Sequence, residues 1–432
     1  MLYITNFLLP LLAVLTALFL GAATYLTYQQ MKGIKGKLHS SEHNPNYNPF
    51  FYGNPVSPDQ FIGRKAEVRR IAGRIVNGGQ SSAITGTFRS GKTSILDYLA
   101  TPKERLYGNK ADTLIFSYWD AKTLPFECDQ AQFWGHLLEP LEKRIAEMPD
   151  SSLYKAYQAS QENHFANLEE LIAQIGKLNW QFVLMIDEFD VLLDRPHLNN
   201  TEFFGGLRKL ASRSRGALVL VLATNISLTG LHKKTRRFSK AGSPYLNFLD
   251  EIVLGPLSDS EIENLLSQDG THFTDDDCQF IKDIAGGYPF LLQVAASSLW
   301  ESYKNSNVDD PIKRQQHAKQ DFYDRTKISL NNIWQSWLPT TRKAFTAVAL
   351  INLERLRTSL KIQAIDIKEI INNEPGFKQA LEELEKQGFV KDDNGDWRLH
   401  PTIFLSFIAD QPAQALRQIF DKTDHSTQAS NQ

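Results

Sequence analysis

Residues 86–93, Gly-Thr-Phe-Arg-Ser-Gly-Lys-Thr, have the spacing GxxxxGK[ST] that binds the phosphate groups of a nucleotide. Glycines let backbone N–H groups turn toward the phosphates, Lys92 reaches the β and γ phosphates, and the hydroxyl of Thr93 is a ligand for Mg²⁺. Short patterns also arise by chance, so the flanking elements must support this one. Residues 81–85 are typical of a strand, and residues 94–99 continue as a helix with apolar residues toward one face. The octet therefore predicts a nucleotide-binding loop between a strand and a helix.

A second apolar run, residues 182–186, ends in Asp187 and Glu188. An unbroken apolar run is typical of a buried parallel strand, and carboxylates at its C-terminal end point into the ligand crevice. We predict that Asp187 holds the Mg²⁺ shell and that Glu188 orients and polarises the attacking water in phosphoryl transfer. A solvated turn is the alternative for an isolated Asp-Glu pair. The phosphate loop upstream favours the catalytic interpretation.

A third apolar run, residues 218–223, is followed by Thr224 and Asn225. Polar groups at a strand tip can sense the γ phosphate or position water, and we predict this role for Asn225. The alternative is that Thr-Asn simply begins a turn.

A positive group at the γ phosphate accelerates phosphoryl transfer, and Arg237 is the candidate for that group. It lies in a basic stretch, residues 232–240, that also fits a solvated loop. Arg208, Arg213 and Arg215 remain alternatives.

Strands alternate with helical stretches from residue 61 onward, which predicts a parallel sheet covered by helices on both faces. The expected fold class is α/β, with a P-loop NTPase core. The candidate strands are residues 82–85, 113–119, 182–187, 217–224 and 251–254.

The composition is that of an ordinary globular protein with room for two or three domains: 432 residues, 42% hydrophobic and 22% charged. The formal net charge of -2 gives no global basic field for nucleic acid. Only Cys128 and Cys278 are present, so no disulfide framework is expected and a reducing compartment fits.

Residues 7–28 carry no charge and are long enough to cross about 30 Å of hydrocarbon as a helix. A signal peptide is the alternative, but residues 1–31 contain no Lys or Arg for its basic region. Lys32, Lys35 and Lys37 follow at once, which places the amino terminus outside and the rest of the chain in the cytoplasm. We therefore predict a single-pass anchor in the cytoplasmic (inner) membrane. The polar stretch that follows is expected to be a tether, with the aromatic residues 50–52 docked on the next domain.

Further segments resemble the AAA+-like NTPases of the STAND class, in particular its prokaryotic branch. Residues 61–67, Phe-Ile-Gly-Arg-Lys-Ala-Glu, look like the GRxxE segment of these families. Residues 243–257 resemble the segment that joins core to lid, and residues 286–293 look like the GxP element of the helical lid. The resemblance covers roughly residues 58–305.

The resemblance implies an ATPase that requires Mg²⁺ and is slow or regulated. Such proteins are switches that bind ATP or ADP and act in signalling, stress response or phage defence, here through a partner protein or a homo-oligomer. In this class the GRxxE segment lies against the adenine and ribose, and the lid proline packs near the adenine. AAA+ motors usually carry an arginine in the lid helix, where this chain has Gln293, Ser297 and Ser298, which favours a switch.

The predicted site therefore has three groups of residues. The nucleotide-binding group is Gly63, Arg64, Gly86, Thr87, Arg89, Ser90, Gly91, Lys92, Thr93, Ser94 and Pro289. The metal ligands are Thr93 and Asp187, and the catalytic group is Glu188, Asn225 and Arg237.

Beyond residue 325, three helices and a hairpin with an Asn-Gly turn resemble a winged helix. Its third helix, residues 377–387, carries Glu382, Glu383 and Glu385. Phosphates would repel this acidic face, so DNA is not expected as a partner. The alternative function is an initiator-like or loader-like AAA+ ATPase that uses the winged helix on nucleic acid.

The predicted organisation has six parts. They are a transmembrane anchor (1–31), a linker (32–58), the P-loop ATPase core (59–256), a helical lid (257–325), a winged-helix-like domain (326–410), and a helix end with a disordered tail (411–432).

Overall fold

The structure, a computed structural model, describes residues 47–421 except 102, 162–164, 236–243, 269–272 and 305–309. The predicted membrane span, Arg237 and the predicted tail from residue 422 lie outside the described residues. Within the described ranges, no helix is both long and apolar enough to cross a membrane. The elements below belong to one unit, Phe50–Ser267 with Phe273–Gln432.

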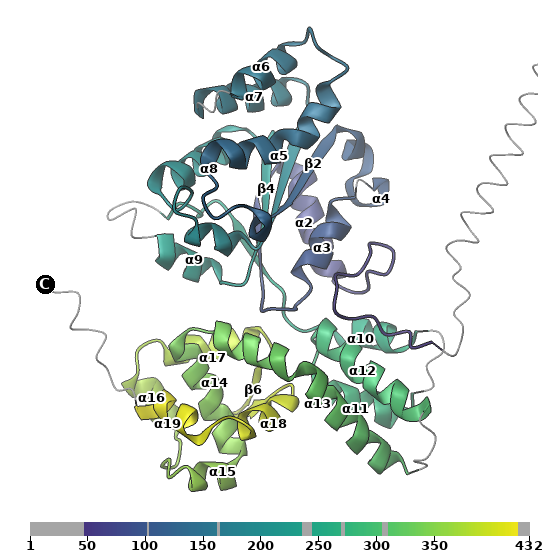
Figure 1. The fold of residues 1–432 in the computed structure, drawn as a ribbon, viewed down its shortest axis with the longest axis vertical. Coiled ribbons are helices and arrows are strands. Elements are labelled where there is room, and N and C mark those ends of the chain that lie inside the picture. Colours follow the sequence, from purple (N-terminus) through teal and green to yellow (C-terminus); the bar gives the residue numbers. More distant parts are fainter. Residues whose placement is uncertain are drawn as a thin grey trace, which may run out of the picture. The chain divides into compact units, whose positions relative to one another are not determined.

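Five parallel strands form the central sheet in the order β2-β3-β4-β1-β5. Figure 1 labels β2 and β4 of this sheet. Thr85, the last residue of β1, pairs with Thr224 at the end of β4 and with Val253 at the end of β5. The carboxyl ends of these strands therefore share one edge, and all five strand predictions agree with the structure to within one residue. The strands are β1 (Ser82–Thr85), β2 (Leu114–Asp120), β3 (Gln181–Asp187), β4 (Leu218–Thr224) and β5 (Asp250–Val253).

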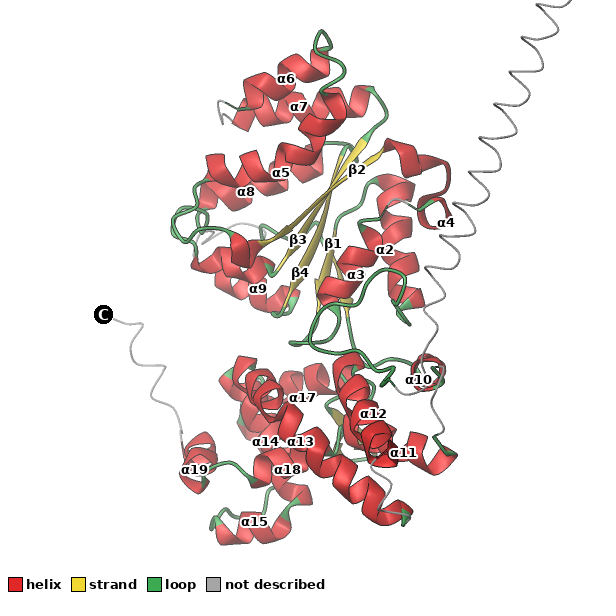
Figure 2. Cartoon of the chain, turned by 45° about the vertical axis from the view of Figure 1, so that its right-hand side comes forward, coloured by secondary structure: helices red, strands yellow, loops and turns green. Residues whose placement is uncertain are grey.

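Helices cover both faces of the sheet, as predicted (Figure 2). Because successive side chains of a strand point to opposite faces, β3 buries Val183 and Met185 against one helical layer and Phe182 and Leu184 against the other. This two-sided burial explains the unbroken apolar run. One layer contains α2 (Lys65–Gly78), α3 (Lys92–Leu99) and α4 (Glu104–Tyr107). The other contains α5 (Gln130–Ile145), α6 (Ser152–Ser160), α7 (Phe165–Lys177), α8 (Thr201–Arg213) and α9 (Leu228–Thr235).

A run of helices follows β5, and capping residues define where two of them begin. Ser258 and Glu261 form a capping box at one, and Thr274 and Asp277 form another, so that first-turn carboxylates satisfy free N–H groups. The last helix of the run continues across residue 325, where the sequence predicts a domain boundary. The helices are α10 (Asp259–Leu266), α11 (Asp275–Ala285), α12 (Pro289–Lys304) and α13 (Pro311–Ser336).

The described C-terminal part contains the three helices and the hairpin that the sequence predicts, together with three further short helices. Asn394 and Gly395 both have positive φ, 58° and 96°, as a tight hairpin turn requires. Phe389 packs edge to face against Trp337 and Phe345 in a core that also includes residues of α12, so this part and the lid share one core. The elements are α14 (Pro339–Asn352), α15 (Glu354–Ser359), α16 (Ile367–Asn373), α17 (Phe377–Lys386), β6 (Val390–Asp393), β7 (Asp396–Leu399), α18 (Ile403–Ala409) and α19 (Ala413–Asp421).

Candidate active site

The predicted phosphate loop connects the end of β1 to the start of α3. Gly91 caps that helix with φ of 94°, a conformation that favours glycine. A Cβ on Gly86 would lie 2.6 Å from the Ser90 Oγ and 3.2 Å from the Leu254 Cβ, so a side chain there would displace its neighbours. The observed backbone therefore favours glycine at both positions of the sequence pattern.

Lys92 is buried, with 5% of its surface exposed, and its Nζ lies among oxygens at the carboxyl edge of the sheet. It donates to the carbonyl oxygens of Gly86 (3.1 Å) and Thr87 (2.9 Å) and to Asn225 Oδ1 (2.8 Å). Burial lowers the pKa of Lys92, and the charges of Glu188 and Asp187 act in the opposite direction. The loop thus holds its cation next to the predicted sensing residue.

The two predicted Mg²⁺ ligands are in direct contact. Thr93 Oγ1 donates to Asp187 Oδ2 at 2.6 Å, and the hydroxyl of Tyr118 lies 3.5 Å from the same oxygen. Burial raises the pKa of Asp187, while hydrogen bonds from Thr93 and from the backbone N–H of Glu188 lower it. A hydroxyl and one carboxylate are a suitable protein contribution to Mg²⁺, which usually takes its other ligands from phosphates and water.

Both carboxylate oxygens of Glu188 are engaged. Asn225 Nδ2 donates to Oε2 at 2.6 Å, and Lys122 Nζ lies 2.8 Å from Oε1. Glu188 has a positive φ of 51°, a conformation of the kind found at functional sites. Lys122 is a site residue that the sequence reasoning missed. It lies just after β2, and only the pairing of β2 with β3 brings it to Glu188.

Gly63 and Arg64, predicted to lie against the adenine and ribose, are absent from the residues that line the pocket. Arg64 is 3% exposed, and its Nη2 donates to the carbonyl oxygens of Gly255 (2.6 Å) and Ser90 (3.3 Å). Burial lowers its pKa, with the charge of Glu67 opposing. In this structure Arg64 therefore contacts the phosphate loop through the backbone carbonyl of Ser90, outside the pocket lining.

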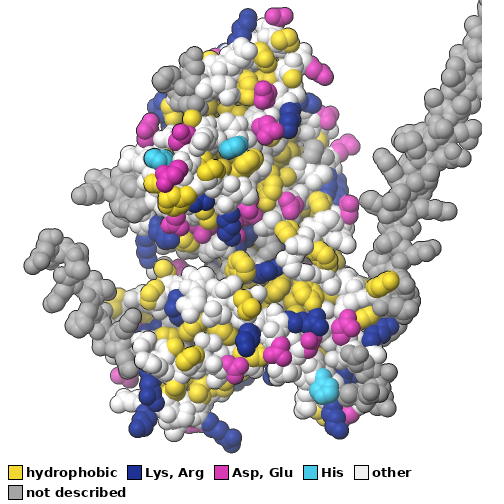
Figure 3. All heavy atoms as spheres, viewed as in Figure 1, with side chains coloured by type: hydrophobic (Ala, Val, Ile, Leu, Met, Phe, Trp, Pro, Cys, Tyr) yellow, Lys and Arg dark blue, Asp and Glu magenta, His cyan; other side chains and the backbone are white. Residues whose placement is uncertain are grey.

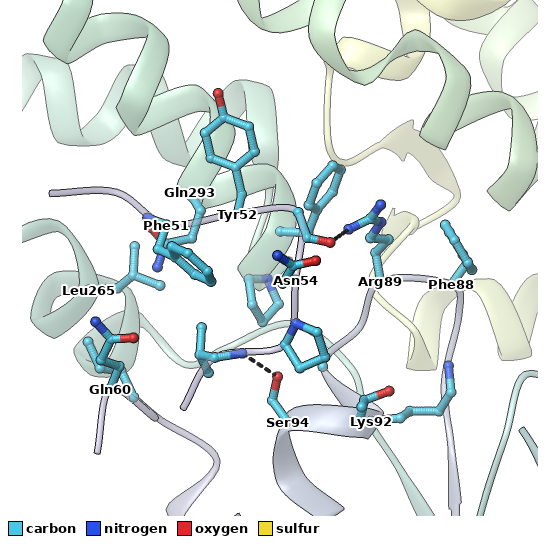
Figure 4. Close-up of a pocket in the computed structure, with 18 of the residues that line it drawn as sticks. Phe51, Tyr52, Asn54, Gln60, Phe88, Arg89, Lys92, Ser94, Leu265 and Gln293 are labelled. Atoms are coloured by element: carbon cyan, nitrogen blue, oxygen red, sulfur yellow. Dashed lines mark hydrogen bonds between the residues drawn. The ribbon is translucent and has the colours of Figure 1, made fainter. Parts of the chain in front are cut away.

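A pocket of about 270 Å³ extends from the phosphate loop to the lid (Figure 4). Lys92, Thr93, Glu188 and Pro289 contribute to it. That Pro289 packs near the adenine stays a prediction. Mostly apolar and amide side chains line the remainder, with a few other polar ones, which suits a base and sugar. These further residues are Phe51, Tyr52, Gly53, Asn54, Pro55, Val56, Gln60, Ile62, Phe88, Arg89, Gly91, Ser94, Leu265, Phe290 and Gln293.

One wall of the pocket is a segment that we call the strap, residues 51–56. Its backbone is bound at three points: Phe51 N donates to Gln293 Oε1 (3.1 Å), Gly53 O accepts from Arg89 Nη1 (2.7 Å), and Val56 N donates to Ser94 Oγ (3.2 Å). Figure 4 shows the last two contacts. Ahead of the strap, Phe50 is buried and stacks on Phe273 with ring centroids 5.7 Å apart. The sequence predicts this aromatic docking, but it gives no signal for the wall.

Two of the three alternative arginines lie apart from the site. Arg213 and Arg215 line a hollow with Gln181 and Ala217, near the amino ends of β3 and β4. That edge of the sheet is opposite to the phosphate loop. Neither residue can therefore reach the γ phosphate.

Two polar atoms of the phosphate loop show whether its residues suit a phosphate. Thr87 Oγ1 and Ser90 Oγ are buried and have no hydrogen-bond partner within the described part of the chain. Buried hydroxyls without partners are costly, so a ligand with acceptor oxygens would stabilise this loop. The residues present fit a bound nucleotide phosphate.

Solved structures of similar fold include a Walker-type ATPase of Pyrococcus abyssi, with a TM-score of 0.53 at 14% identity over 83% of this chain and 98% of that chain. The ORC2 protein of Aeropyrum pernix, in ADPNP-ADP complexes, has a TM-score of 0.49 at 14% identity over 84% and 95% of the two chains. The ORC1 protein of the same organism, in complex with DNA, has a TM-score of 0.38 at 15% identity over 86% and 96%. The chain has the parallel-sheet core fold of a P-loop ATPase.

No protein-family model and no curated protein matches the sequence. The likeness to solved structures concerns the fold, so the STAND class, the membrane anchor and the winged helix stay predictions. The prediction that DNA is not a partner likewise stays a prediction.

Proposed function

We propose that this protein binds ATP with Mg²⁺ and hydrolyses it. The supporting observation is the hydrogen-bonded series Lys92, Asn225 and Glu188 at the carboxyl edge of the sheet, with the Thr93–Asp187 pair beside it. Lys92 and the loop N–H groups would bind the phosphates, and Thr93 and Asp187 would hold the metal. Bound Mg²⁺ supplies charge neutralisation at the transferred phosphoryl group.

Glu188 is the proposed residue that orients the attacking water. Its carboxylate already accepts a hydrogen bond from Asn225 and pairs with Lys122, so the attacking water competes with these partners for the remaining acceptor positions. We therefore propose a low basal turnover.

The test is phosphate release from ATP by the purified full chain, with Mg²⁺ and with EDTA. We expect turnover below about 1 s⁻¹, the lower end of ordinary enzymes, and none with EDTA. Failure of the chain to bind ATP in equilibrium dialysis would overturn the proposal.

We further propose that ATP binding serves a switch that acts on a protein partner in signalling, stress response or defence. Two observations support a switch over a motor. The lid helix α12 contains no arginine, and the lid shares its core with the C-terminal helices, so a change in the lid reaches them directly.

A second candidate is an ATPase that acts on nucleic acid. The order of α14, α16, α17 and the β6–β7 hairpin is that of a winged helix, and Lys391 and Arg398 are exposed on the hairpin. Against it, Asp392, Asp393 and Asp396 are exposed on the same hairpin. On the face seen in Figure 3, acidic and basic side chains are intermixed.

Titration of the full chain with duplex DNA at two salt concentrations separates the candidates. Micromolar binding that weakens steeply with salt identifies the nucleic-acid function. Absence of such DNA binding favours the switch that acts on a protein partner.

The membrane anchor at residues 7–28 also remains a proposal, supported by its length and lack of charge. The full chain is expected in the membrane pellet after an alkaline carbonate wash. Recovery in the supernatant would contradict the anchor.

A further inference from the structure

Residues 286–289 form the turn that leads into α12 and include its first residue. One residue of this turn contacts the pocket, and its neighbour contacts the C-terminal part. We call this segment the lid turn. Pro289 lines the pocket. The adjacent Tyr288 donates its hydroxyl to the carbonyl oxygen of Gln387, and its ring stacks on Phe389 with centroids 4.6 Å apart. Tyr288 is buried, with 2% of its surface exposed. Two consecutive residues thus connect the ligand pocket to the end of α17 and the start of β6.

The lid turn is packed too closely to move alone. A Cβ on Gly287 would lie 2.4 Å from the Cβ of Pro256, and a Cβ on Gly388 would lie 2.7 Å from the Cγ of the same proline. Pro256 therefore fills the space between the lid turn and the chain that leads into β6. Because close-packed groups have no free volume in which to shift separately, a displacement of the lid turn is passed to Gly388.

The phosphate loop reaches the same proline by a second route. Arg64 Nη2 donates both to Ser90 O in the loop and to Gly255 O, the residue just before Pro256. A Cβ on Gly255 would lie 3.1 Å from the carbonyl oxygen of Lys386, so the end of α17 is in contact here as well. The phosphate end and the base end of the pocket therefore converge on one junction.

We propose that the lid turn couples nucleotide occupancy to the placement of α17 and the β6–β7 hairpin, with Tyr288 as the positioning residue that transmits it. This inference rests on the proposed binding of ATP. Tyr288 is absent from the pocket lining and acts through its hydrogen bond to Gln387. Because coupling free energies are reciprocal, a partner that displaces the hairpin changes nucleotide affinity by the same factor.

The test is hydrogen–deuterium exchange of the full chain with and without Mg²⁺ and a non-hydrolysable ATP analogue. In the wild type, we expect the amides of residues 384–392 to exchange about 5-fold or more differently in the two states, the lower range of allosteric coupling. Tyr288→Phe removes one hydroxyl and keeps the stacked ring. This variant should still bind the analogue. The difference in amide exchange of its residues 384–392 between the two states should fall below about 2-fold.

Tyr323→Phe is the matched control. Its hydroxyl donates to Asp410 Oδ2 at 2.7 Å, a partly buried hydrogen bond that lies outside the junction. This variant should therefore keep the wild-type difference in amide exchange between the two states. A wild type that binds the analogue without a change in residues 384–392, or a Tyr288→Phe variant that keeps the change, overturns the inference. Absence of analogue binding by the wild type overturns the proposed ATPase instead.

Discussion

The chain builds the two ends of the pocket differently. At the phosphate end, Lys92, Glu188 and Asn225 follow β1, β3 and β4 closely in sequence, and their side chains bond to one another. At the opposite end, the strap meets the lid through Phe51 and Gln293, which are 242 positions apart. The phosphate end is a product of local motifs on a parallel sheet, where strand ends meet at one edge. The other end depends on tertiary contacts.

This difference predicts large effects at the phosphate end. Glu188→Gln keeps the size and the hydrogen bond from Asn225 but removes the charge that orients water. We expect ATP turnover to fall by about 10²- to 10⁴-fold, the contribution of a general base, with ATP binding retained. Single-turnover kinetics with saturating ATP measure the effect, and unchanged turnover would assign the base to another residue.

Lys92→Ala removes the buried ammonium group and the hydrogen bonds that it donates to Gly86 O, Thr87 O and Asn225 Oδ1. We expect ATP affinity to fall by about 10- to 100-fold, because hydrogen bonds to charged groups contribute about 1.5–3 kcal/mol. Equilibrium titration with a fluorescent ATP analogue measures it. An unchanged affinity would place the nucleotide elsewhere.

Lys122→Ala should act in the opposite direction on turnover. Lys122 is half exposed, so its pairing with Glu188 is screened and amounts to about 0.2–1 kcal/mol. Freeing the carboxylate should raise basal turnover by about 1.5- to 5-fold. The control is Lys143→Ala, which removes an exposed pair with Glu139 at the same 2.8 Å distance and should leave turnover unchanged. Equal turnover in the two variants would show that Lys122 does not restrain the base.

At the strap we expect a smaller effect on ATP affinity than that of Lys92→Ala. Gln293→Leu removes the acceptor for Phe51 N–H, a loss of about 0.5–1.5 kcal/mol, so ATP affinity should weaken by about 2- to 10-fold. Gln379→Leu, at an exposed position of α17 outside the pocket lining, is the control. An effect as large as that of Lys92→Ala would erase the contrast between the two ends.

The sequence was sufficient for the strands and for the residues at their ends. Apolar runs with polar tips predict buried parallel strands, and this places Asp187, Glu188 and Asn225 correctly at one edge of the sheet. The contact of Lys122 with Glu188 could not be predicted from the sequence. A single lysine in a turn belongs to no motif, and the contact arises because β2 lies next to β3 in the sheet. The same limit applies to Arg64, whose motif suggests a ligand contact while its burial directs the guanidinium to backbone carbonyls. The role of Arg237 stays a prediction outside the described residues.

The strap has a mechanical consequence. Phe50 is buried against Phe273, and the next six residues are attached to Gln293, Arg89 and Ser94. A pulling force on the chain ahead of Phe50 would therefore load these attachments one after another before it reached the sheet. These three hydrogen bonds contribute little free energy compared with the packing of the five-stranded core. Such a force would detach the strap from the pocket while the fold of the protein remained intact.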